Sequence, residues 1–194
     1  MKILAFVDMH GSKNALDMIK SKAKKVDLII CAGDVSVFER NLQRHLTNLS
    51  TIDKPILMIP GNHETPDLLK RMCDKFDNIF YIHKGIFEFG GVSFIGYGEG
   101  GFDMRDEVFV RFTKKIKSSL REKKVLITHA PPFGTIIDWL GNSHVGNKDY
   151  SDFLKHNKIN LMVCGHLHET SGKEDRINKT KIINPGPYGR IIEI

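Results

Sequence analysis

The sequence has few cysteines, and their arrangement suggests neither disulfides nor a zinc knuckle. Only three cysteines occur among 194 residues, at positions 31, 73 and 164, and no two of them are spaced as CxxC. An odd number without such a pair argues against a disulfide framework. Cys31 and Cys164 each lie near the end of an apolar run. We therefore expect them to be small core residues, and we expect a reducing, cytoplasmic location.

Long apolar runs are also missing. No run approaches the roughly 20 apolar residues of a membrane span, so we expect no membrane partner. The apolar stretch at the N-terminus ends at Asp8, and no small-residue cleavage site of a signal peptide follows it. Repeats, low-complexity segments and linkers are absent from the sequence. With 41% hydrophobic residues, the chain is predicted to form one domain that spans residues 1–194.

The charge balance is mildly basic. Lys and Arg number 29 against 23 Asp and Glu, which gives a net charge of +6. This balance fits an anionic substrate, although a solvated lysine-rich surface is the commoner cause. The lysines are not interleaved with aromatic residues, so nucleic acid is not indicated as a partner. The oligomeric state, including a homodimer, is left open by the sequence.

The first half of the chain alternates between short apolar runs and amphipathic segments. Strands are predicted at residues 3–7, 26–32 and 56–59, and a helix at residues 12–24. A second helix is predicted from the apolar stripe Phe38, Leu42, Leu46 and Leu49, and a third begins at Thr65 with Pro66 in its first turn. This β-α-β-α-β-α order predicts parallel strands joined by helical crossovers.

The second half has a different pattern. Three short strands at residues 79–82, 85–89 and 92–97 predict an antiparallel meander. A helix marked by Phe109, Phe112, Ile116 and Leu120 follows, then a strand at 125–128 and a long loop at 130–147. A short helix at 149–156, a strand at 159–164, a polar hairpin tip within 171–179 and closing strands at 181–184 and 190–194 complete an α/β order.

Five apolar strands end in residue types that bind metals. In an α/β protein the carboxyl ends of parallel strands share one edge, where ligands bind. These side chains are therefore predicted to converge, and the candidate metal ligands are Asp8, His10, Asp34, Asn62, His129, His166 and His168. Carboxylate, amide and imidazole donors without a thiolate suit Mn, Fe or Zn better than Mg or Ca.

The set has too many ligands for one ion and about enough for two. Asp34 stands alone at its strand end, so it is the candidate for a bridging carboxylate. Two ions about 3.5–4 Å apart would lower the pKa of a bridging water, and the resulting hydroxide would attack a phosphoryl group held in line. His63, next to Asn62, is predicted to protonate the leaving oxygen or to stabilise charge on the phosphoryl oxygens.

Taken in order, these motifs resemble the calcineurin-like metallophosphoesterase superfamily, and in particular its small prokaryotic members. The pattern DxH, GD, GNH[DE], H and GHxH is complete between residues 8 and 168. The resemblance implies a four-layer α/β/β/α sandwich of two mixed sheets flanked by helices. It also implies two divalent ions, with Mn favoured among Mn, Fe, Zn and Ni, and His63 as the catalytic histidine. One ion would be held by Asp8, His10, Asp34 and His168, the other by Asp34, Asn62, His129 and His166.

One departure from the superfamily bears on the substrate. Protein phosphatases of this superfamily carry GDxxDRG, but here Asp34 is followed three residues later by Val37, so an acid that would orient His63 is missing. A phosphoprotein substrate is therefore disfavoured. The leading hypothesis is hydrolysis of a small or nucleotide-like phosphodiester. The alternatives are a phosphomonoesterase or nucleotidase, and a non-catalytic scaffold with the same fold.

Several residues near these motifs have open roles. His144 either touches substrate or is an ordinary loop histidine, and Phe102 and Trp139 either stack on an aromatic ester or pack in loops. Glu64 is expected to support its loop from behind rather than to bind metal. His45, His83 and His156 are expected at the surface.

Overall fold

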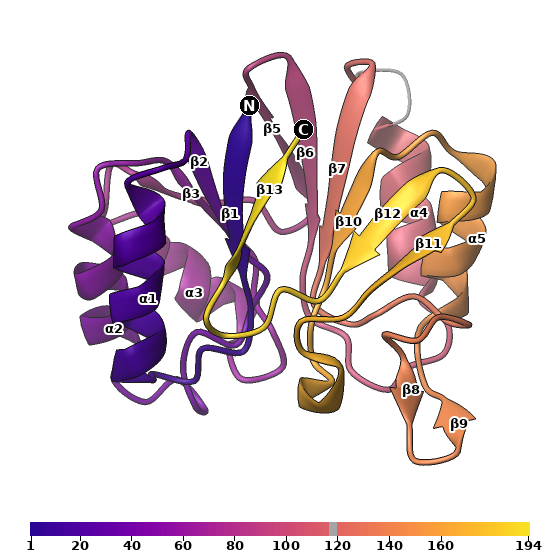
Figure 1. Cartoon of the computed structure of the whole chain (residues 1–194), viewed down its shortest axis with the longest axis horizontal. Coiled ribbons are helices and arrows are strands. Elements are labelled where there is room, and N and C mark those ends of the chain that lie inside the picture. The colour runs from indigo at the N-terminus through magenta and orange to yellow at the C-terminus, as the bar shows by residue number, and fades with distance from the viewer. Residues whose placement is uncertain (117–119) are drawn as a thin grey trace.

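Two β-sheets lie face to face, with helices on both outer sides, in the computed structural model, which describes residues 1–116 and 120–194 (Figure 1). The first sheet has the strand order β13-β1-β2-β3-β4, and β1 to β4 are parallel. Its elements are β1 (Lys2–Phe6), α1 (Lys13–Ala23), β2 (Leu28–Cys31), α2 (Leu42–Ser50), β3 (Ile56–Met58), α3 (Pro66–Cys73), β4 (Ile79–Tyr81) and the antiparallel edge strand β13 (Arg190–Glu193).

The second sheet is built by the rest of the chain in the order β11-β12-β10-β7-β6-β5. Its four middle strands are parallel, and each edge strand is antiparallel to its neighbour. The elements are β5 (Gly85–Phe89), β6 (Val92–Tyr97), α4 (Glu107–Ile116), β7 (Lys123–Thr128), the hairpin β8 (Trp139–Leu140) and β9 (Ser143–His144), α5 (Lys148–His156), β10 (Leu161–Val163), the 3-10 turn η1 (His168–Thr170), β11 (Glu174–Ile177) and β12 (Thr180–Ile183).

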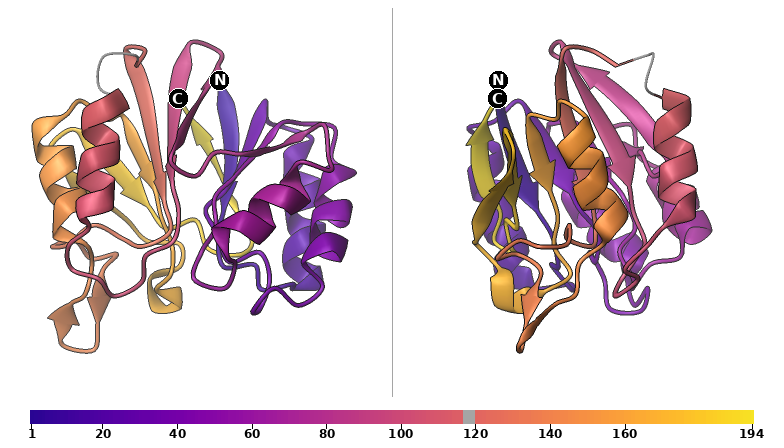
Figure 2. Two further views of the ribbon diagram at one scale, coloured as in Figure 1. Left: turned by 180° about the vertical axis from the view of Figure 1, so that it is seen from behind. Right: turned by 90° about the vertical axis from the view of Figure 1, so that its right-hand side faces the viewer.

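Successive side chains of each strand point to opposite faces of the sheet, and this alternation separates the apolar layers. On β1, Leu4 and Phe6 pack against the helices α1 to α3, whereas Ile3 and Ala5 pack against the second sheet. A third apolar cluster lies between the second sheet and the helices α4 and α5. Both sheets are thus covered on both faces, as the views in Figure 2 show. The predicted four-layer sandwich of two mixed sheets is confirmed.

The antiparallel meander predicted for residues 79–97 is wrong in its first strand. β4 pairs in parallel with β3 in the first sheet, and only β5 and β6 form an antiparallel pair. The reason lies in packing, because Ile79 joins the helix-facing cluster and Phe80 packs against the inter-sheet cluster. The chain therefore passes from one sheet to the other at His83 and Lys84, where Lys84 adopts a left-handed backbone (φ 53°).

Other predicted boundaries differ from the structure. Phe38 was expected on the apolar stripe of α2, but the helix begins at Leu42 and Phe38 lies in an exposed loop. The loop at 130–147 contains the small β8–β9 hairpin, and most of the polar region 171–179 is strand β11. The predicted helix that reaches Leu120 is described as far as Ile116, and its residues 117–119 lie outside the described residues.

The burial of single residues agrees with the sequence-based expectation for some of them and differs for others. Cys31 and Cys164 are buried, as expected of small core residues. His156 is exposed and His45 is half-buried, but the side chain of His83 is only 5% exposed, so its expected surface position is wrong. Among the helices of the two described stretches, none is long and apolar enough to cross a membrane.

Candidate metal centre

The predicted ligands meet at one edge of the sandwich, in the loops that follow five parallel strands. Asp8 and His10 follow β1, Asp34 follows β2, and Asn62 follows β3 in the first sheet. From the second sheet come His129 after β7, His166 after β10, and His168 at the start of η1. Left-handed backbone angles occur at Asp8 (φ 55°), His10 (φ 46°), Asp34 (φ 53°) and His166 (φ 70°). Such conformations cost free energy for residues other than glycine, and they cluster at functional sites.

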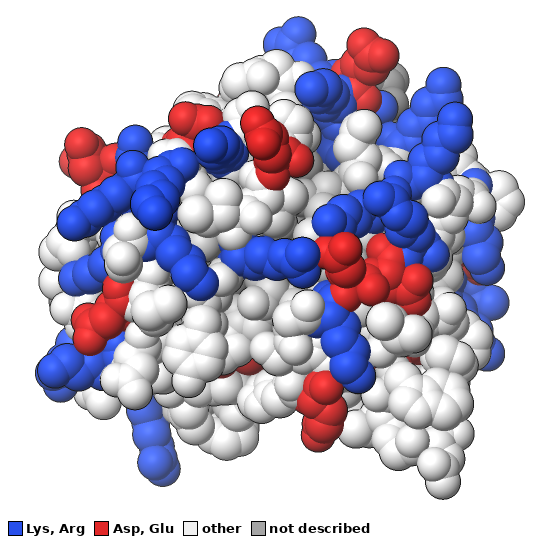
Figure 3. Space-filling view, in the orientation of Figure 1, with Lys and Arg blue, Asp and Glu red and all other residues white. Residues whose placement is uncertain are grey.

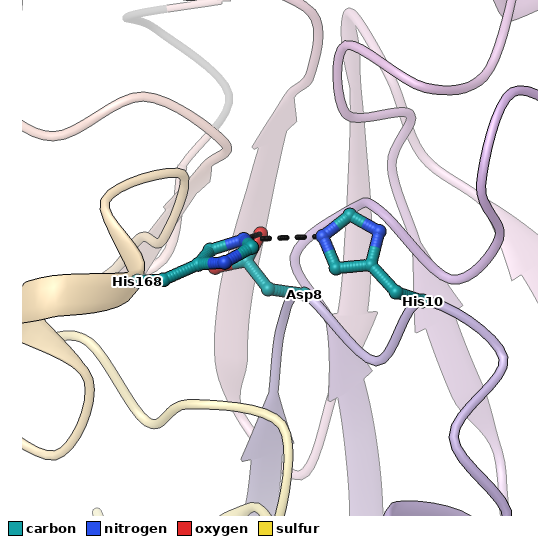
Figure 4. Close-up of side chains that lie close together, drawn as sticks. All are labelled: Asp8, His10 and His168. Atoms are coloured by element: carbon teal, nitrogen blue, oxygen red, sulfur yellow. Dashed lines mark hydrogen bonds and ion pairs between the residues drawn. The ribbon is translucent and has the colours of Figure 1, made fainter.

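The first group of ligands comprises Asp8, His10 and His168, whose side chains point toward one another (Figure 4). The Nε2 atoms of His10 and His168 are 3.1 Å apart, and His168 Nε2 lies 3.9 Å from Asp8 Oδ1. Asp8 Oδ2 accepts the backbone N–H of His166, but the buried Oδ1 has no hydrogen-bond partner. An unpaired buried carboxylate oxygen is costly, so this atom has the environment of a cation ligand.

The second group is centred on Asn62. Its Oδ1 lies 2.9 Å from His129 Nε2 and 2.9 Å from His166 Nδ1. His129 Nε2 is in turn 3.4 Å from Asp34 Oδ2. Oxygen and nitrogen atoms with lone pairs therefore face one another at short range.

Asp34 lies between the two groups. Its Oδ2 is 3.4 Å from His129 Nε2 in one group and 3.8 Å from His10 Nε2 in the other. Burial opposes its ionisation, yet the hydrogen bond and charge of His129 hold the pKa of the Asp34 carboxyl below its ordinary value. Burial raises the pKa of Asp8, and the charge of Asp34 acts in the same direction. This position is the one expected of a carboxylate shared by two ions.

Backbone carbonyls fix the tautomers of two of these histidines. His10 Nδ1 lies 3.1 Å from the carbonyl oxygen of Ser36, and His129 Nδ1 lies 3.0 Å from that of Ala32. A carbonyl only accepts, so each Nδ1 must carry the proton and donate it. The neutral rings therefore present the lone pair of Nε2 to the centre, which is the form that binds a metal.

His63 has the opposite arrangement. Its Nδ1 accepts the backbone N–H of Phe38 at 3.2 Å. The neutral ring therefore carries its proton on Nε2, which lies 3.9 Å from Asp34 Oδ2. A protonated Nε2 cannot ligate a metal but can donate to substrate. The backbone N–H of Phe38 thus holds the His63 ring in place, although position 37 has a valine instead of an acidic residue.

Glu64 supports these loops from behind. Its buried carboxylate accepts the N–H groups of Asp34 and Gly61 at Oε2, at 3.0 and 3.2 Å. At Oε1 it accepts the N–H and the hydroxyl of Ser36, both at 2.8 Å. Burial raises the pKa of Glu64, and these donors oppose that rise. The carboxylate fastens the loop after β2 to the loop after β3, as expected for a supporting residue.

Glycines let these loops approach one another closely. A Cβ at Gly61 would overlap Asp34 Oδ1, and a Cβ at Gly165 would lie 2.9 Å from Asp8 Oδ2. At Gly33 a Cβ would lie 2.6 Å from the backbone nitrogen of Gly61, and Gly33 also has a left-handed backbone, with φ 100°. All three glycines are therefore required for space, and Gly33 is required for its conformation as well.

The side chains present fit a pair of divalent ions. Asp34 lies between two groups of oxygen and nitrogen donors, the buried Asp8 Oδ1 has no hydrogen-bond partner, and His129 directs Nε2 toward Asn62 Oδ1 and Asp34 Oδ2. Without a cation, the charge of Asp34 raises the pKa of His129 although burial opposes this, and burial lowers the pKa of His166 to about 4. A bound ion would displace the proton that His129 holds, so metal affinity should fall at low pH.

The roles of some residues around the centre could not be predicted from the sequence. The carbonyl groups of Ala32 and Ser36 carry no sequence signal, because every residue has one. His144 turns out to contact Asp138, with Nδ1 2.9 Å from Oδ1, in the turn that carries the β8–β9 hairpin. Asp138 also accepts the N–H groups of Gly134, Thr135 and Gly146. The contacts of His144 described by the structure therefore support this turn.

Comparison with known families decides the relationship of the chain. The family model described as calcineurin-like phosphoesterase matches residues 1–170. The chain belongs to this family. The predicted resemblance is confirmed, and the family is one of phosphoesterases that depend on two metal ions.

Individual relatives are distant. A probable glycerophosphodiester phosphodiesterase GpdQ of Arcobacter nitrofigilis is 26% identical over 179 residues, which cover 85% of this chain and 65% of the relative. A probable cyclic nucleotide phosphodiesterase, CBUA0032 of Coxiella burnetii, is 24% identical over 155 residues, with 73% and 60% covered. The chain thus spans less than two thirds of both relatives. The crystal structure of TT1561 from Thermus thermophilus has the same fold, with a TM-score of 0.78, 16% identity, and 95% and 88% of the two chains covered.

Proposed function

We propose that this protein is a dinuclear metal-dependent phosphodiesterase that hydrolyses a small or nucleotide-like phosphodiester. The observation that carries the proposal is the contrast between the histidines. His10 and His129 turn an Nε2 lone pair to the centre, whereas His63 turns an N–H to it. The centre thus combines atoms that can bind metals with a separate hydrogen-bond donor.

The ligand roles follow the two groups. Asp8, His10 and His168 would hold one ion and Asn62, His129 and His166 would hold the other, with Asp34 available to both. The mixed oxygen and nitrogen donors favour Mn, with Fe, Zn and Ni as alternatives. When bound, two such metal ions supply an activated water and act as Lewis acids that polarise the phosphoryl oxygens.

His63 acts on the substrate in this proposal. Its Nε2–H donates a hydrogen bond to a phosphoryl oxygen as negative charge develops. Proton transfer to the leaving oxygen would need the imidazolium, in which Nδ1 carries a proton and no longer accepts the Phe38 N–H. The Phe38 N–H keeps Nδ1 unprotonated and holds the ring in place. Asp34 Oδ1 accepts the backbone N–H of His63 at 3.0 Å, so a hydrogen bond fixes His63 next to the proposed bridging ligand.

A diester is favoured over a monoester by the charges at the centre and by the relatives. In the described part of the chain, the cationic groups in ion-pair range of Asp8 and Asp34 are all histidines. A diester carries one negative charge and needs less neutralisation than a monoester dianion. The two relatives described above are both named as probable phosphodiesterases, which supports the same preference.

A paired assay tests the proposal. Bis(4-nitrophenyl) phosphate and 4-nitrophenyl phosphate share a leaving group, and each is offered with Mn, Ni, Zn or Mg. The proposal expects a higher kcat/KM for the diester, and it expects Asp34→Ala to abolish turnover. Preferential turnover of the monoester would instead favour the phosphomonoesterase or nucleotidase. A metal-loaded wild type that cleaves neither ester would favour the non-catalytic scaffold.

A further inference from the structure

We propose that Phe38 and Phe102 form an aromatic pair that stacks on planar aromatic substituents of the substrate, so that the substrates are nucleoside or aryl phosphodiesters. The inference rests on the proposed phosphodiesterase function and narrows its substrate class. It separates an aromatic diester from an alkyl diester such as a glycerol ester.

The two rings flank the metal centre, one from each sheet. Phe38 lies in the loop between β2 and α2, and its ring centroid is 4.3 Å from that of His63. Phe102 lies in the loop between β6 and α4, with its ring centroid 4.7 Å from that of His166 in an edge-on arrangement. A phosphoryl group held between the ligand sets would therefore have an aromatic ring beside it in the loops of both sheets.

Packing does not explain why these two residues are aromatic. Phe38 is 71% exposed and Phe102 is 58% exposed, so neither ring contributes much to a core. Phe38 also adopts a left-handed backbone (φ 46°), which is unfavourable for a bulky residue. Asn41, three residues later, has a similar φ of 53° with a residue type that tolerates it. A strained, exposed ring next to a site histidine is better explained by a ligand than by stability.

The surroundings of Phe38 leave room for a planar group. A surface hollow of ≈ 210 Å³ is lined by Phe38, Glu39, Asn62, His63, Glu64 and Thr65. The hollow brings together the Phe38 ring, the hydrogen-bond donor His63 and the predicted metal ligand Asn62. A larger hollow of ≈ 530 Å³ lies beside Glu122 and Asn160, next to the amino ends of β7 and β10 and thus away from the centre.

The distribution of charge agrees with an uncharged substituent. Lys and Arg gather over the upper part of the face in Figure 3, whereas the lower part, toward which β1 and β10 end in Figure 1, is mostly uncharged. The lining of the hollow beside Phe38 includes Glu39, whose carboxylate would repel a second negative charge on the substrate.

Two chromogenic diesters isolate the effect of the planar group. The 4-nitrophenyl ester of thymidine 5′-phosphate and the 4-nitrophenyl ester of the abasic 1,2-dideoxyribose 5-phosphate have the same leaving group, sugar and charge, and they differ only in the nucleobase. The readout is the ratio of their kcat/KM values with Mn-loaded protein. Stacking of a base on an aromatic ring changes such a ratio by about 5- to 150-fold. The wild type should prefer the thymidine ester by a factor in this range.

Substitutions then assign the preference to the rings. Phe38→Ala or Phe102→Ala, or the double variant, should reduce the ratio toward one. Phe38→Tyr keeps a ring and should retain the ratio. Val108→Ala removes another exposed apolar side chain (42% exposed), from α4, and should leave the ratio unchanged. A wild-type ratio near one, or a high ratio that survives in the double variant, would overturn the inference.

A binding measurement separates this inference from the proposed activity. If the wild type hydrolyses neither diester, calorimetry compares adenosine 5′-monophosphate with ribose 5-phosphate, two monoesters of equal charge that differ in the base. Tighter binding of the nucleotide by the wild type, lost in the double variant, would support the aromatic pair although the phosphodiesterase proposal had failed. Equal affinities for the two monoesters would refute the aromatic pair as well.

Discussion

Replacing Glu64 by glutamine tests whether the Glu64 carboxylate holds together the loops that follow β2 and β3. Glu64 is only 4% exposed, and its carboxylate accepts four hydrogen bonds, from the N–H groups of Asp34, Ser36 and Gly61 and from the Ser36 hydroxyl. Glutamine has nearly the same shape but replaces one acceptor oxygen by an NH₂ donor. At least one of the three backbone N–H groups must then lose its partner.

The magnitude follows from these contacts. In the better orientation the new NH₂ faces Ser36, whose hydroxyl can turn to accept, so that only the Ser36 N–H is left unpaired. An unpaired buried N–H costs about 1–3 kcal/mol, and the bonds from Asp34 and Gly61 lose about 1 kcal/mol each without the charge. Relief of the buried charge offsets part of this loss. We expect Glu64→Gln to lower the free energy of unfolding by about 2–4 kcal/mol.

Urea unfolding followed by circular dichroism measures this loss, and Glu39→Gln is the matched control. Glu39 also accepts an N–H and a hydroxyl, both from Thr65, but at an exposed position where water can replace it. The control should change stability by no more than about 0.5 kcal/mol. Glu64→Gln should also weaken Mn binding by about 10- to 100-fold, because residues behind the ligands set their geometry. Equal stability of the two variants, with unchanged Mn affinity, would refute the fastening role.

Three further predictions address single residues. His63→Ala should reduce kcat by similar factors for diesters with alkoxide and nitrophenolate leaving groups, because a neutral ring stabilises charge on the phosphoryl oxygens without supplying a proton; a much larger reduction with the alkoxide would show that His63 protonates the leaving group. Gly61→Ala should weaken Mn binding, measured by calorimetry, because its Cβ would overlap Asp34 Oδ1; unchanged affinity would show that the loop has room. Burial lowers the pKa of His83 to about 4, and its Nδ1 accepts the N–H of Gly98, so the folded protein keeps this ring neutral. The neutral ring therefore contributes its full stabilisation above the unfolded pKa of about 6.5, and the free energy of unfolding falls by up to about 3 kcal/mol as the pH drops toward 4. His83→Gln should remove this part of the pH dependence of urea unfolding. An identical pH profile in the variant would contradict the assignment.

Much of the fold and of the centre could be predicted from the sequence, because strand ends and ligand types are local signals. The parallel strands β1 to β3 and the convergence of Asp8, Asp34 and His129 follow from apolar runs that stop at polar residues. The sheet to which β4 belongs could not be predicted in this way. Its short apolar run fits either a meander or a fourth parallel strand, and only the packing of Ile79 and Phe80 decides between them.

The details of the centre that were not predicted depend on the backbone. Phe38 continues the apolar spacing of α2, but the helix begins later, and left-handed angles turn the Phe38 N–H toward His63 and its ring toward solvent. The tautomers of His10 and His129 likewise depend on carbonyl groups that every residue possesses. Such contacts appear only when the loops are placed in three dimensions.

The central claim, two ions that share Asp34, is tested most directly by metal stoichiometry. Metal-free protein is titrated with Mn, and bound metal is counted by mass spectrometry while diester hydrolysis is followed in the same samples. The account predicts two ions per wild-type chain, turnover that requires both, and loss of both ions in Asp34→Asn. One ion per active chain, or an Asp34→Asn variant that retains two ions, would contradict it.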